Sequence, residues 1–232
     1  IRSRSPSRGL GDVYKRQGLG SSSACCVAAA LSISNLFSKL DKNQILELAI
    51  EAEKTIFPNT SGADCTVSVF GGIIDYQKDN GYEIIETNHE FDFIVVNSKK
   101  SHSTNIVVNR VNEFKNENKK IFDDLCGEES KLIEKAIDSL QKFDLETLGK
   151  CMAQNQIFLE QLGVSNDLLL SIVKLVEKET FGAKITGAGD GGCVIALTEK
   201  NKKDSVLEHI KVEYESYPVT IDKVGMQVFN TN

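Results

Sequence analysis

The segment GLGSSS at residues 18–23 is the first part of the sequence whose residue types could do chemistry. It leads into ACCVAAALSISNLFSKL, which we expect to form a helix. Glycines let a backbone turn tightly and approach a ligand closely, and the N-terminus of a helix attracts anions. Serine hydroxyls there can reach phosphate oxygens or a phosphate-bound Mg²⁺. The segment indicates anion binding, although a capped turn has the same composition and the Walker pattern Gly-Lys-[Ser/Thr] is absent from the sequence.

Two carboxylates, Glu53 and Asp64, follow at a separation of eleven residues. We expect Asp64 to lie in a loop, Ser61-Gly62-Ala63-Asp64, just before a strand. A carboxylate in that position can accept the proton of a substrate hydroxyl during phosphoryl transfer, but it can equally bond to its own turn. Glu53 lies roughly 80° around a predicted helix from Ile45, on the flank of the buried face. There it could hold Mg²⁺ or be a solvated helix residue.

A third segment, TGAGDGG at residues 186–192, lies between two apolar stretches that we expect to be strands. Four of the six residues after Thr186 are glycine, which costs conformational entropy on folding. This composition indicates that a ligand or another part of the chain approaches the backbone closely. A tight β-turn is the alternative.

The remaining sequence predicts the elements that must position these segments. A helix should begin at Asp41, because Gln44 completes a capping-box pattern with it. Its expected buried face consists of Ile45, Ala49, Ala52 and Ile56. In the next part of the chain we expect two short strands in VSVFGGIIDYQ, a hairpin at 79–81 and a buried strand EFDFIVVNSK with a loop at 98–104. The middle of the chain should form helices near 105–125, 128–142, 144–162 and 166–180, the last capped by Ser165. After them we expect strands on both sides of residues 186–192, a helix near 201–212 and a strand near 218–229. Strands surrounded by helix pairs indicate α+β organisation with a boundary within 85–95.

The charge of the chain is unevenly distributed. The formal net charge is -6, yet four of the five arginines lie in the first 17 residues, which carry +4, while the other 215 residues carry -10. The acidic balance argues against a nucleic-acid partner, and residues 1–17 have the composition of a disordered or foreign tail. Six cysteines without a C-x-x-C pair are typical of reduced thiols in a cytosolic protein, and no apolar run approaches the roughly 20 residues that cross a bilayer.

The three segments, taken in this order and spacing, resemble the GHMP kinases, which include galacto-, homoserine, mevalonate and phosphomevalonate kinases. Residues 18–22 match the second motif of that family, and KITGAGDGGC at 184–193 matches the third. Within the family the chain is most similar to the mevalonate kinase branch. The segments that carry this similarity are Ser61-Gly62-Ala63-Asp64 with Val67-Ser68 and Gly71-Gly72, and Asn155-Gln156 with Leu159 and Leu162-Gly163-Val164-Ser165.

The resemblance implies a cytoplasmic enzyme that phosphorylates the 5-hydroxyl of mevalonate with ATP and Mg²⁺, an early step of isoprenoid and sterol synthesis. It implies a two-domain α+β fold with a foreign tail at 1–17, an incomplete ATP-binding domain at 18–90 and a ferredoxin-like domain at 91–232. It also allows a homodimer, and it implies no nucleic-acid or membrane partner.

The resemblance also implies roles for individual residues. Asp64 would accept the proton of the hydroxyl, Ser22 and Glu53 would hold Mg²⁺, and Thr104 is a weaker candidate near the substrate. The residues that would bind ATP phosphates or shape the site beside them are Gly18, Leu19, Gly20, Ser21, Ser22, Thr186, Gly187, Ala188 and Gly189.

Two departures from the family pattern bear on activity. Asp190 stands where the family usually has glycine, and a carboxylate near bound phosphates would repel them unless it points away or meets Mg²⁺. The family's first motif with its lysine is absent, and Lys15-Arg16-Gln17 stand where small residues are expected. We therefore expect an N-terminally truncated enzyme without useful activity as a 232-residue chain. Another GHMP small-molecule kinase (galactokinase, homoserine kinase or phosphomevalonate kinase), or a non-catalytic metabolite-binding protein on the same scaffold, stays an alternative.

Overall fold

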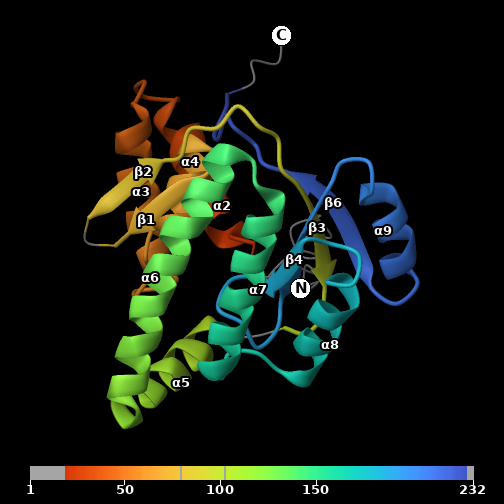
Figure 1. Ribbon diagram of the computed structural model, residues 1–232. Coiled ribbons are helices and arrows are strands. Elements are labelled where there is room, and N and C mark those ends of the chain that lie inside the picture. The colour runs from red at the N-terminus through yellow and green to blue at the C-terminus, as the bar shows by residue number, and fades with distance from the viewer. Residues whose placement is uncertain (1–18, 79, 102, 229–232) are drawn as a thin grey trace, which may run out of the picture.

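The computed structural model describes residues 19–78, 80–101 and 103–228 (Figure 1). Its helices are α2 (Ser21–Ser34), α3 (Lys42–Lys54), α4 (Ala63–Phe70), α5 (Thr104–Glu117), α6 (Lys119–Lys142), α7 (Leu145–Gln161), α8 (Asp167–Val176) and α9 (Lys203–Lys211). Its strands are β1 (Ile74–Gln77), β2 (Gly81–Ile84), β3 (Asp92–Asn97), β4 (Gly182–Ile185), β5 (Cys193–Thr198) and β6 (Glu215–Thr220). The organisation is α+β, as the sequence predicts.

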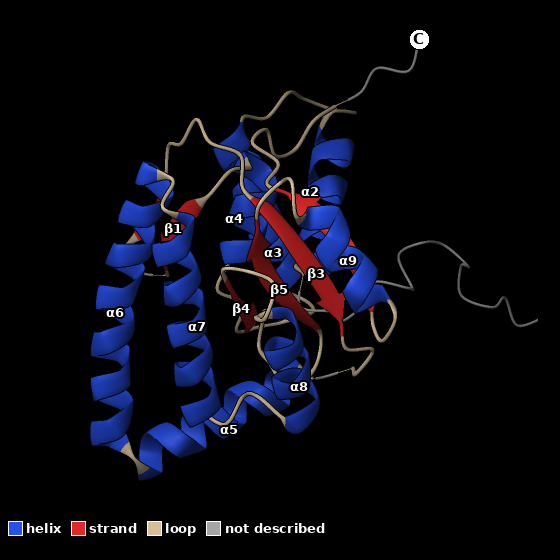
Figure 2. Cartoon of the chain, turned by 45° about the vertical axis from the view of Figure 1, so that its right-hand side comes forward, coloured by secondary structure: helices blue, strands red, loops and turns tan. Residues whose placement is uncertain are grey.

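A four-stranded antiparallel sheet with the order β4-β5-β3-β6 organises the larger part of the molecule. One of its faces, which includes Ile94, Val96 and Val194, packs against apolar side chains of α8 and α9. On the other face, Phe93 and Ile195 contact a cluster that α6 and α7 complete. Figure 2 shows these two long helices side by side next to the sheet. Because β3 is central and covered on both faces, its apolar residues form a nearly continuous run.

A smaller part of the molecule is built from α2, α3, α4 and the β1–β2 hairpin. Its core contains Cys26 and Val27 of α2, Ile45 and Ala49 of α3, and Cys65 and Val69 of α4. The expected capping box at the start of α3 is confirmed, since the Gln44 N–H donates to the Asp41 carboxylate at 2.9 Å and the Asp41 N–H donates to the Gln44 side chain at 3.0 Å. This box satisfies two N–H groups that the first turn would otherwise leave unpaired.

Two of the four residues that we expect on the buried face of α3 are buried. Ile45 and Ala49 are buried, but Ala52 and Ile56 are exposed. The helix ends at Lys54, so Ile56 lies beyond it, and the third buried position is Glu53. Positions four residues apart line one narrow stripe of a helix, and here a carboxylate occupies the last position of that stripe.

The segment VSVFGGIIDYQ contains one strand and not two. Its first half belongs to α4, which begins after Gly62 (φ 87°) and ends at Phe70, just before Gly71 (φ 73°). Thr66 donates its hydroxyl to the Gly62 carbonyl at 2.9 Å and stabilises the first turn. The alternation of Val67, Ser68 and Val69 resembles a strand, but the two left-handed glycines limit the segment to a short helix.

Boundaries in the second half of the chain also differ from expectation. The first two helices after β3 meet at Asn118 (φ -127°, ψ 45°), earlier than predicted. The side chain of Asn166, and not that of Ser165, caps α8 by accepting from the Leu169 N–H at 3.1 Å. β6 spans 215–220 and not 218–229, because it pairs along the full six-residue length of β3.

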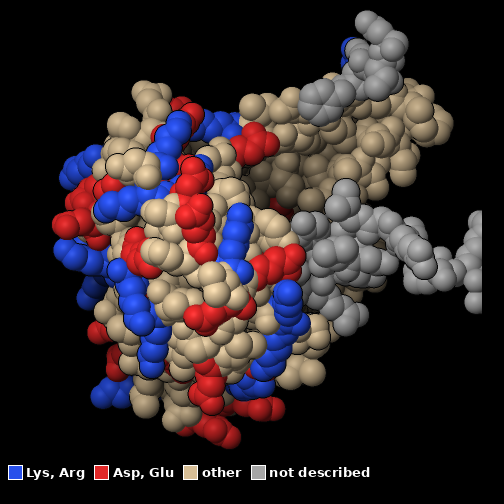
Figure 3. All heavy atoms as spheres, turned by 90° about the vertical axis from the view of Figure 1, so that its right-hand side faces the viewer, with Lys and Arg blue, Asp and Glu red and all other residues tan. Residues whose placement is uncertain are grey.

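One face of the molecule carries charges of both signs, and the cysteine thiols are unpaired. Figure 3 shows Lys and Arg interspersed with Asp and Glu over the face of the molecule on the α9 side. All six cysteines are free thiols. No helix in the described residues is both long and apolar enough to span a bilayer. Residues 1–17, which we expect to be a foreign tail, lie outside the described residues.

Helix α7 and the sheet approach each other closely at two glycines, Gly149 and Gly182. A Cβ atom at Gly149 would lie 2.2 Å from the Phe181 carbonyl oxygen, and one at Gly182 would lie 2.1 Å from the Gly149 carbonyl oxygen. About two turns further along α7, the buried Gln156 side chain accepts the Ile185 N–H of edge strand β4 at 2.9 Å. Helix α7 thus covers the edge of the sheet, and only glycine fits at the crossing.

We expect Gly149→Ala to lower the free energy of unfolding by about 3 kcal/mol, because the backbone of β4 would have to move. Urea denaturation followed by circular dichroism measures this change. Gly127→Ala is the matched control: Gly127 lies within α6 with no atom near its Cβ position, so we expect a gain of about 0.5–1 kcal/mol there. Equal effects of the two variants would contradict the close packing of α7 on β4.

Candidate active site

The N-terminus of α2 has the properties of an anion-binding loop. Gly20 is left-handed (φ 66°) and begins the helix without a side-chain cap among the described residues. The Ala24 N–H donates to the Gly20 carbonyl at 3.0 Å, so the N–H groups of the three serines before it precede the first intrahelical hydrogen bond. Leu19 is half exposed next to this turn. Gly18, the first expected residue of the loop, lies outside the described residues.

Glu53 reaches this helix from α3. It is only 3% exposed and accepts hydrogen bonds from Ser22 (3.3 Å), Ser23, Thr60 (2.6 Å) and Cys65 (3.5 Å). Burial would raise the pKa of this carboxyl, but the four hydrogen bonds outweigh burial and hold the pKa below its ordinary value. Glu53 is therefore a fully buried, ionised carboxylate, and not a residue on the flank of its helix.

Asp64 lies in the first turn of α4, so the expectation that it lies in a loop before a strand is wrong. Its side chain packs directly against Gly20, where an added Cβ would lie 3.2 Å from the Asp64 Cγ. Burial, together with the negative charge of nearby Glu53, raises the pKa of the Asp64 carboxyl. A carboxylate with a raised pKa is a stronger base than an ordinary aspartate.

A hollow of about 440 Å³ opens beside Asp64, between α4 and the sheet. Asp64 is the single charged residue of its lining, and the others are mostly aliphatic or aromatic: Ala63, Val67, Gly72, Ile73, Ile74, Tyr76, Phe93, Ile195, Val219, Thr220 and Ile221. The Tyr76 hydroxyl donates to the Ser61 carbonyl and thereby supports the turn that leads into α4. A mostly apolar hollow with a small number of polar groups is the usual form of a small-molecule site.

The loop at 186–192 is left-handed at Gly187, Gly189, Asp190 and Gly192. A Cβ at Gly189 would lie 2.2 Å from the Val164 carbonyl oxygen, so this glycine is required by a contact within the chain. The loop also contacts the connection between β3 and α5. Thr104 follows that connection as the first residue of α5, and is not part of the loop as expected.

The structure therefore assembles the candidate residues in two groups. Ser22, Glu53 and Asp64 meet around Gly20, while the loop at 186–192 lies against the segment that leads to Thr104. None of the hydrogen bonds described above links the two groups. Sequence reasoning missed Ser23 and Thr60, although both carry hydroxyls near predicted site residues, because nothing in the local pattern shows which hydroxyl points at Glu53.

The donor set of the first group fits Mg²⁺. The Ser22 hydroxyl and the Glu53 carboxylate are 3.3 Å apart, and both offer the oxygen ligands that this ion prefers. No group of three or more His, Cys, Asp or Glu side chains within the described residues could hold a metal ion. A divalent ion here would take its other ligands from phosphate oxygens and water, as Mg²⁺ commonly does.

Two family models match this chain: the N-terminal domain of GHMP kinases at residues 8–72 and the C-terminal region of GHMP kinases at residues 136–215. The chain belongs to the GHMP kinase family. This membership confirms the predicted α+β fold of the GHMP kinases. The N-terminal match begins inside residues 1–17, and the expected limits of the tail and of the domains at 18–90 and 91–232 stay predictions.

Among its relatives, this GHMP kinase is 36% identical over 219 residues to the mevalonate kinase of Thermococcus sibiricus, covering 91% of this chain and 65% of that protein. It is 32% identical to the mevalonate kinase of Aeropyrum pernix, covering 88% of this chain and 64% of that protein. The chain thus spans about 65% of the length of these relatives.

Solved structures show the same likeness. The mevalonate kinase of L. major in complex with R-mevalonate superimposes with a TM-score of 0.82 at 28% identity, covering 88% of this chain and 66% of that chain. The Methanococcus jannaschii mevalonate kinase has a TM-score of 0.74 at 29% identity, covering 91% and 65%. The Lactococcus lactis galactokinase complexed with galactose, at 18% identity and a TM-score of 0.69, shares the fold.

We expect Glu53→Gln to lower the pKa of Asp64, because the negative charge of Glu53 disfavours the ionised form of Asp64. A ¹³C NMR titration of the Asp64 carboxyl carbon measures the midpoint. Glu51→Gln is the matched control, since Glu51 lies on the exposed side of α3 and pairs with Lys54. A midpoint of Asp64 that stays unchanged or rises in Glu53→Gln would contradict the electrostatic coupling of the two carboxylates.

Proposed function

We propose that the protein transfers the γ-phosphate of ATP to the 5-hydroxyl of mevalonate. The observation that carries this proposal is the position of Asp64, whose carboxylate packs on Gly20 at the start of α2 and borders an apolar hollow. A base, an anion-binding helix N-terminus and an acceptor-sized space lie together there. The proposal concerns the whole protein, because the chain spans about 65% of the length of its relatives.

Each group has a chemical task in this proposal. The N-terminus of α2, with left-handed Gly20 before it, offers N–H groups to the phosphates. Ser22 and Glu53 would hold Mg²⁺, which neutralises phosphate charge when bound. Asp64 orients the acceptor hydroxyl and takes its proton as the oxygen forms its bond to phosphorus and ADP leaves. The raised pKa of Asp64 favours this proton transfer.

The lining of the hollow supports mevalonate over a sugar as the acceptor. Its walls include Phe93, Ile195 and Val219, which suit a branched hydrocarbon segment better than a ring that carries many hydroxyls. The relatives named above that are at least 30% identical are mevalonate kinases, whereas the likeness to galactokinase at 18% identity concerns the fold alone. We therefore rank the other small-molecule kinases of the family second.

Asp190 and the absent lysine of the first motif are the two features that favour a non-catalytic protein on the same scaffold. The Asp190 carboxylate is paired with Lys100 at 3.0 Å and Arg110 at 3.3 Å, so its charge is compensated within the chain. A compensated carboxylate repels phosphates much less than a free one. This pairing favours an enzyme over a binding protein on the same scaffold.

We expect Asp64→Asn to reduce mevalonate phosphorylation by about 10²–10⁴-fold, because the amide cannot accept the hydroxyl proton. ATP binding should persist, since Asp64 is not a phosphate ligand in this proposal. The measurement is coupled ADP release by the full-length protein, with mevalonate, galactose, homoserine and phosphomevalonate as acceptors. Asp75→Asn on β1 is the control. Turnover of galactose without mevalonate, or full activity of Asp64→Asn, would refute the proposal.

A further inference from the structure

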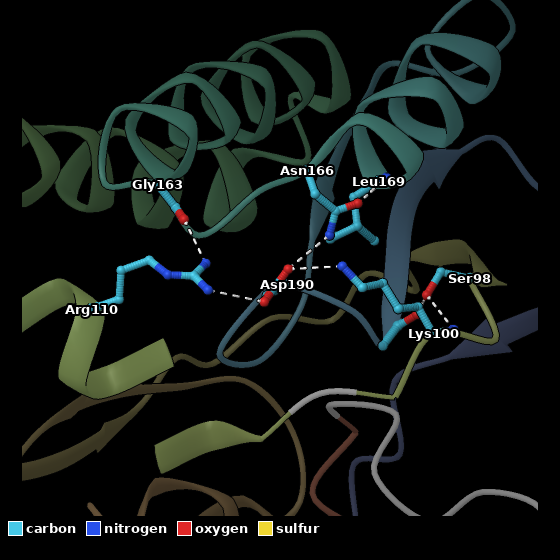
Figure 4. A network of polar contacts seen from close by, with 8 residues as sticks. Ser98, Lys100, Arg110, Gly163, Asn166, Leu169 and Asp190 are labelled. Atoms are coloured by element: carbon cyan, nitrogen blue, oxygen red, sulfur yellow. Dashed lines mark hydrogen bonds and ion pairs between the residues drawn. The ribbon is translucent and has the colours of Figure 1, made fainter. Parts of the chain in front are cut away.

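Asp190 joins three segments that are far apart in the sequence (Figure 4). One carboxylate oxygen accepts from Lys100 Nζ at 3.0 Å and from Asn166 Nδ2 at 3.2 Å, and the other accepts from Arg110 Nη2 at 3.3 Å. Lys100 belongs to the β3–α5 connection, Arg110 to α5, and Asn166 to the turn between α7 and α8. We refer to these four residues as the Asp190 clasp.

Backbone hydrogen bonds connect the same parts of the chain as the Asp190 clasp. The Asp190 N–H donates to the Val164 carbonyl at 2.7 Å, and the Gly192 N–H donates to the Lys100 carbonyl at 2.9 Å. The Gly192 carbonyl accepts from the Ser98 N–H at 3.0 Å and from the Ser98 hydroxyl at 2.6 Å. The loop at 186–192 is therefore held between the β3–α5 connection on one side and the α7–α8 turn on the other.

The backbone is strained at two positions of this contact. Non-glycine residues with positive φ within the described residues are Lys99, Phe143 and Asp190, and two of these lie here with φ 57°. The left-handed region disfavours residues that carry a Cβ, so surrounding contacts must compensate. Lys99 is fixed by its N–H, which donates to the Asn97 side chain at 2.9 Å, and Lys100 follows directly with its ammonium on Asp190.

Two residues of the Asp190 clasp also form hydrogen bonds with other parts of the chain. Arg110 also donates to the Gly163 carbonyl at 3.2 Å, and Asn166 also caps α8 through the Leu169 N–H. An isolated ion pair at a surface contributes little stability. A carboxylate with three donors from three segments is different, because its loss releases two cations and an amide at once.

We propose that Asp190 is a positioning residue that holds the β3–α5 connection, and with it Thr104 at the start of α5, against the glycine loop. Its effect on catalysis rests on the proposed function, together with the place near the substrate that the family resemblance implies for Thr104. Asp190 is then not merely a tolerated replacement for glycine. It fixes the shape of the loop through Lys100 and Arg110, and acts on the acceptor through them.

Hydrogen exchange tests the clasp without reference to activity. Asp190→Gly is the informative variant, because it relieves the backbone strain and removes only the side-chain contacts. We expect the amides of Ser98, Lys100 and Gly192 to exchange about tenfold faster in Asp190→Gly and in Asp190→Asn than in the unchanged chain. Asp123→Asn, which breaks the exposed pair with Lys119 on α6, should leave these amides unchanged. Wild-type exchange rates in Asp190→Gly would overturn the proposal.

Kinetics of the full-length protein test the effect on the acceptor. We expect Asp190→Gly to raise the KM for mevalonate about five- to tenfold, with kcat and the KM for ATP changed less than about twofold. Arg110→Gln should do the same, and the double variant should be no worse than the worse single one, because both remove one interaction. Parallel changes in kcat and both KM values, or additive effects, would overturn the positioning role. If the unchanged protein does not phosphorylate mevalonate, the proposed function fails while the exchange result still decides the clasp.

Discussion

The buried carboxylate of Glu53 is the interaction on which the smaller part of the molecule depends. Four side chains donate to it, from α2, from the loop after α3 and from α4. Hydrogen bonds to a charged group contribute roughly 1.5–3 kcal/mol each, and a buried carboxylate without them would be strongly unfavourable. Burial and the charge of Glu53 raise the pKa of Cys65 to about 12, so its thiol stays protonated and remains a donor.

In the proposed function, the same carboxylate also takes part in the chemistry of the site. The Ser22 hydroxyl lies 3.3 Å from the Glu53 carboxylate, whose negative charge is also close to Asp64. The donors to Glu53 and the Gly20 contact of Asp64 hold α2, α3 and α4 in one arrangement. A group that holds the fold together is thus also the group that would hold Mg²⁺ and make Asp64 more basic. This double use explains why a charged residue takes a position where the helical pattern alone expects an apolar one.

The larger part of the molecule is organised by close backbone contacts. Gly149 and Gly182 allow α7 to lie directly on the edge of the sheet, and Gln156 satisfies an N–H of the edge strand. Gly189 packs on the Val164 carbonyl in the same way, so the glycine loop begins from a rigid base. The clasp then adds side-chain contacts on top of that base. Rigid support on both sides of a loop is what a precise phosphoryl-transfer site requires.

Local sequence patterns predicted those features that depend on neighbours a few residues away. The capping box at Asp41 and Gln44 is one example, and the strands on both sides of residues 186–192 are another. The resemblance of residues 18–22 and 184–193 identified the family, because such glycine-rich motifs have a limited set of uses. The α+β class followed from the order of the elements.

Tertiary structure alone decided how the charges of this protein are used. Residues 18–232 carry a net charge of -10, and two of the acidic residues that contribute to it have very different surroundings. Glu53 is buried among hydroxyls, whereas Asp190 is paired with cations that lie 80 and 90 residues away in the sequence. Tertiary structure also turned the segment around Asp64 into a helix, since two left-handed glycines and packing on α2 outweigh a strand-like alternation. Periodicity reports which side of an element is apolar. The partner of a charge is set by the distances that folding creates, and local sequence does not contain them.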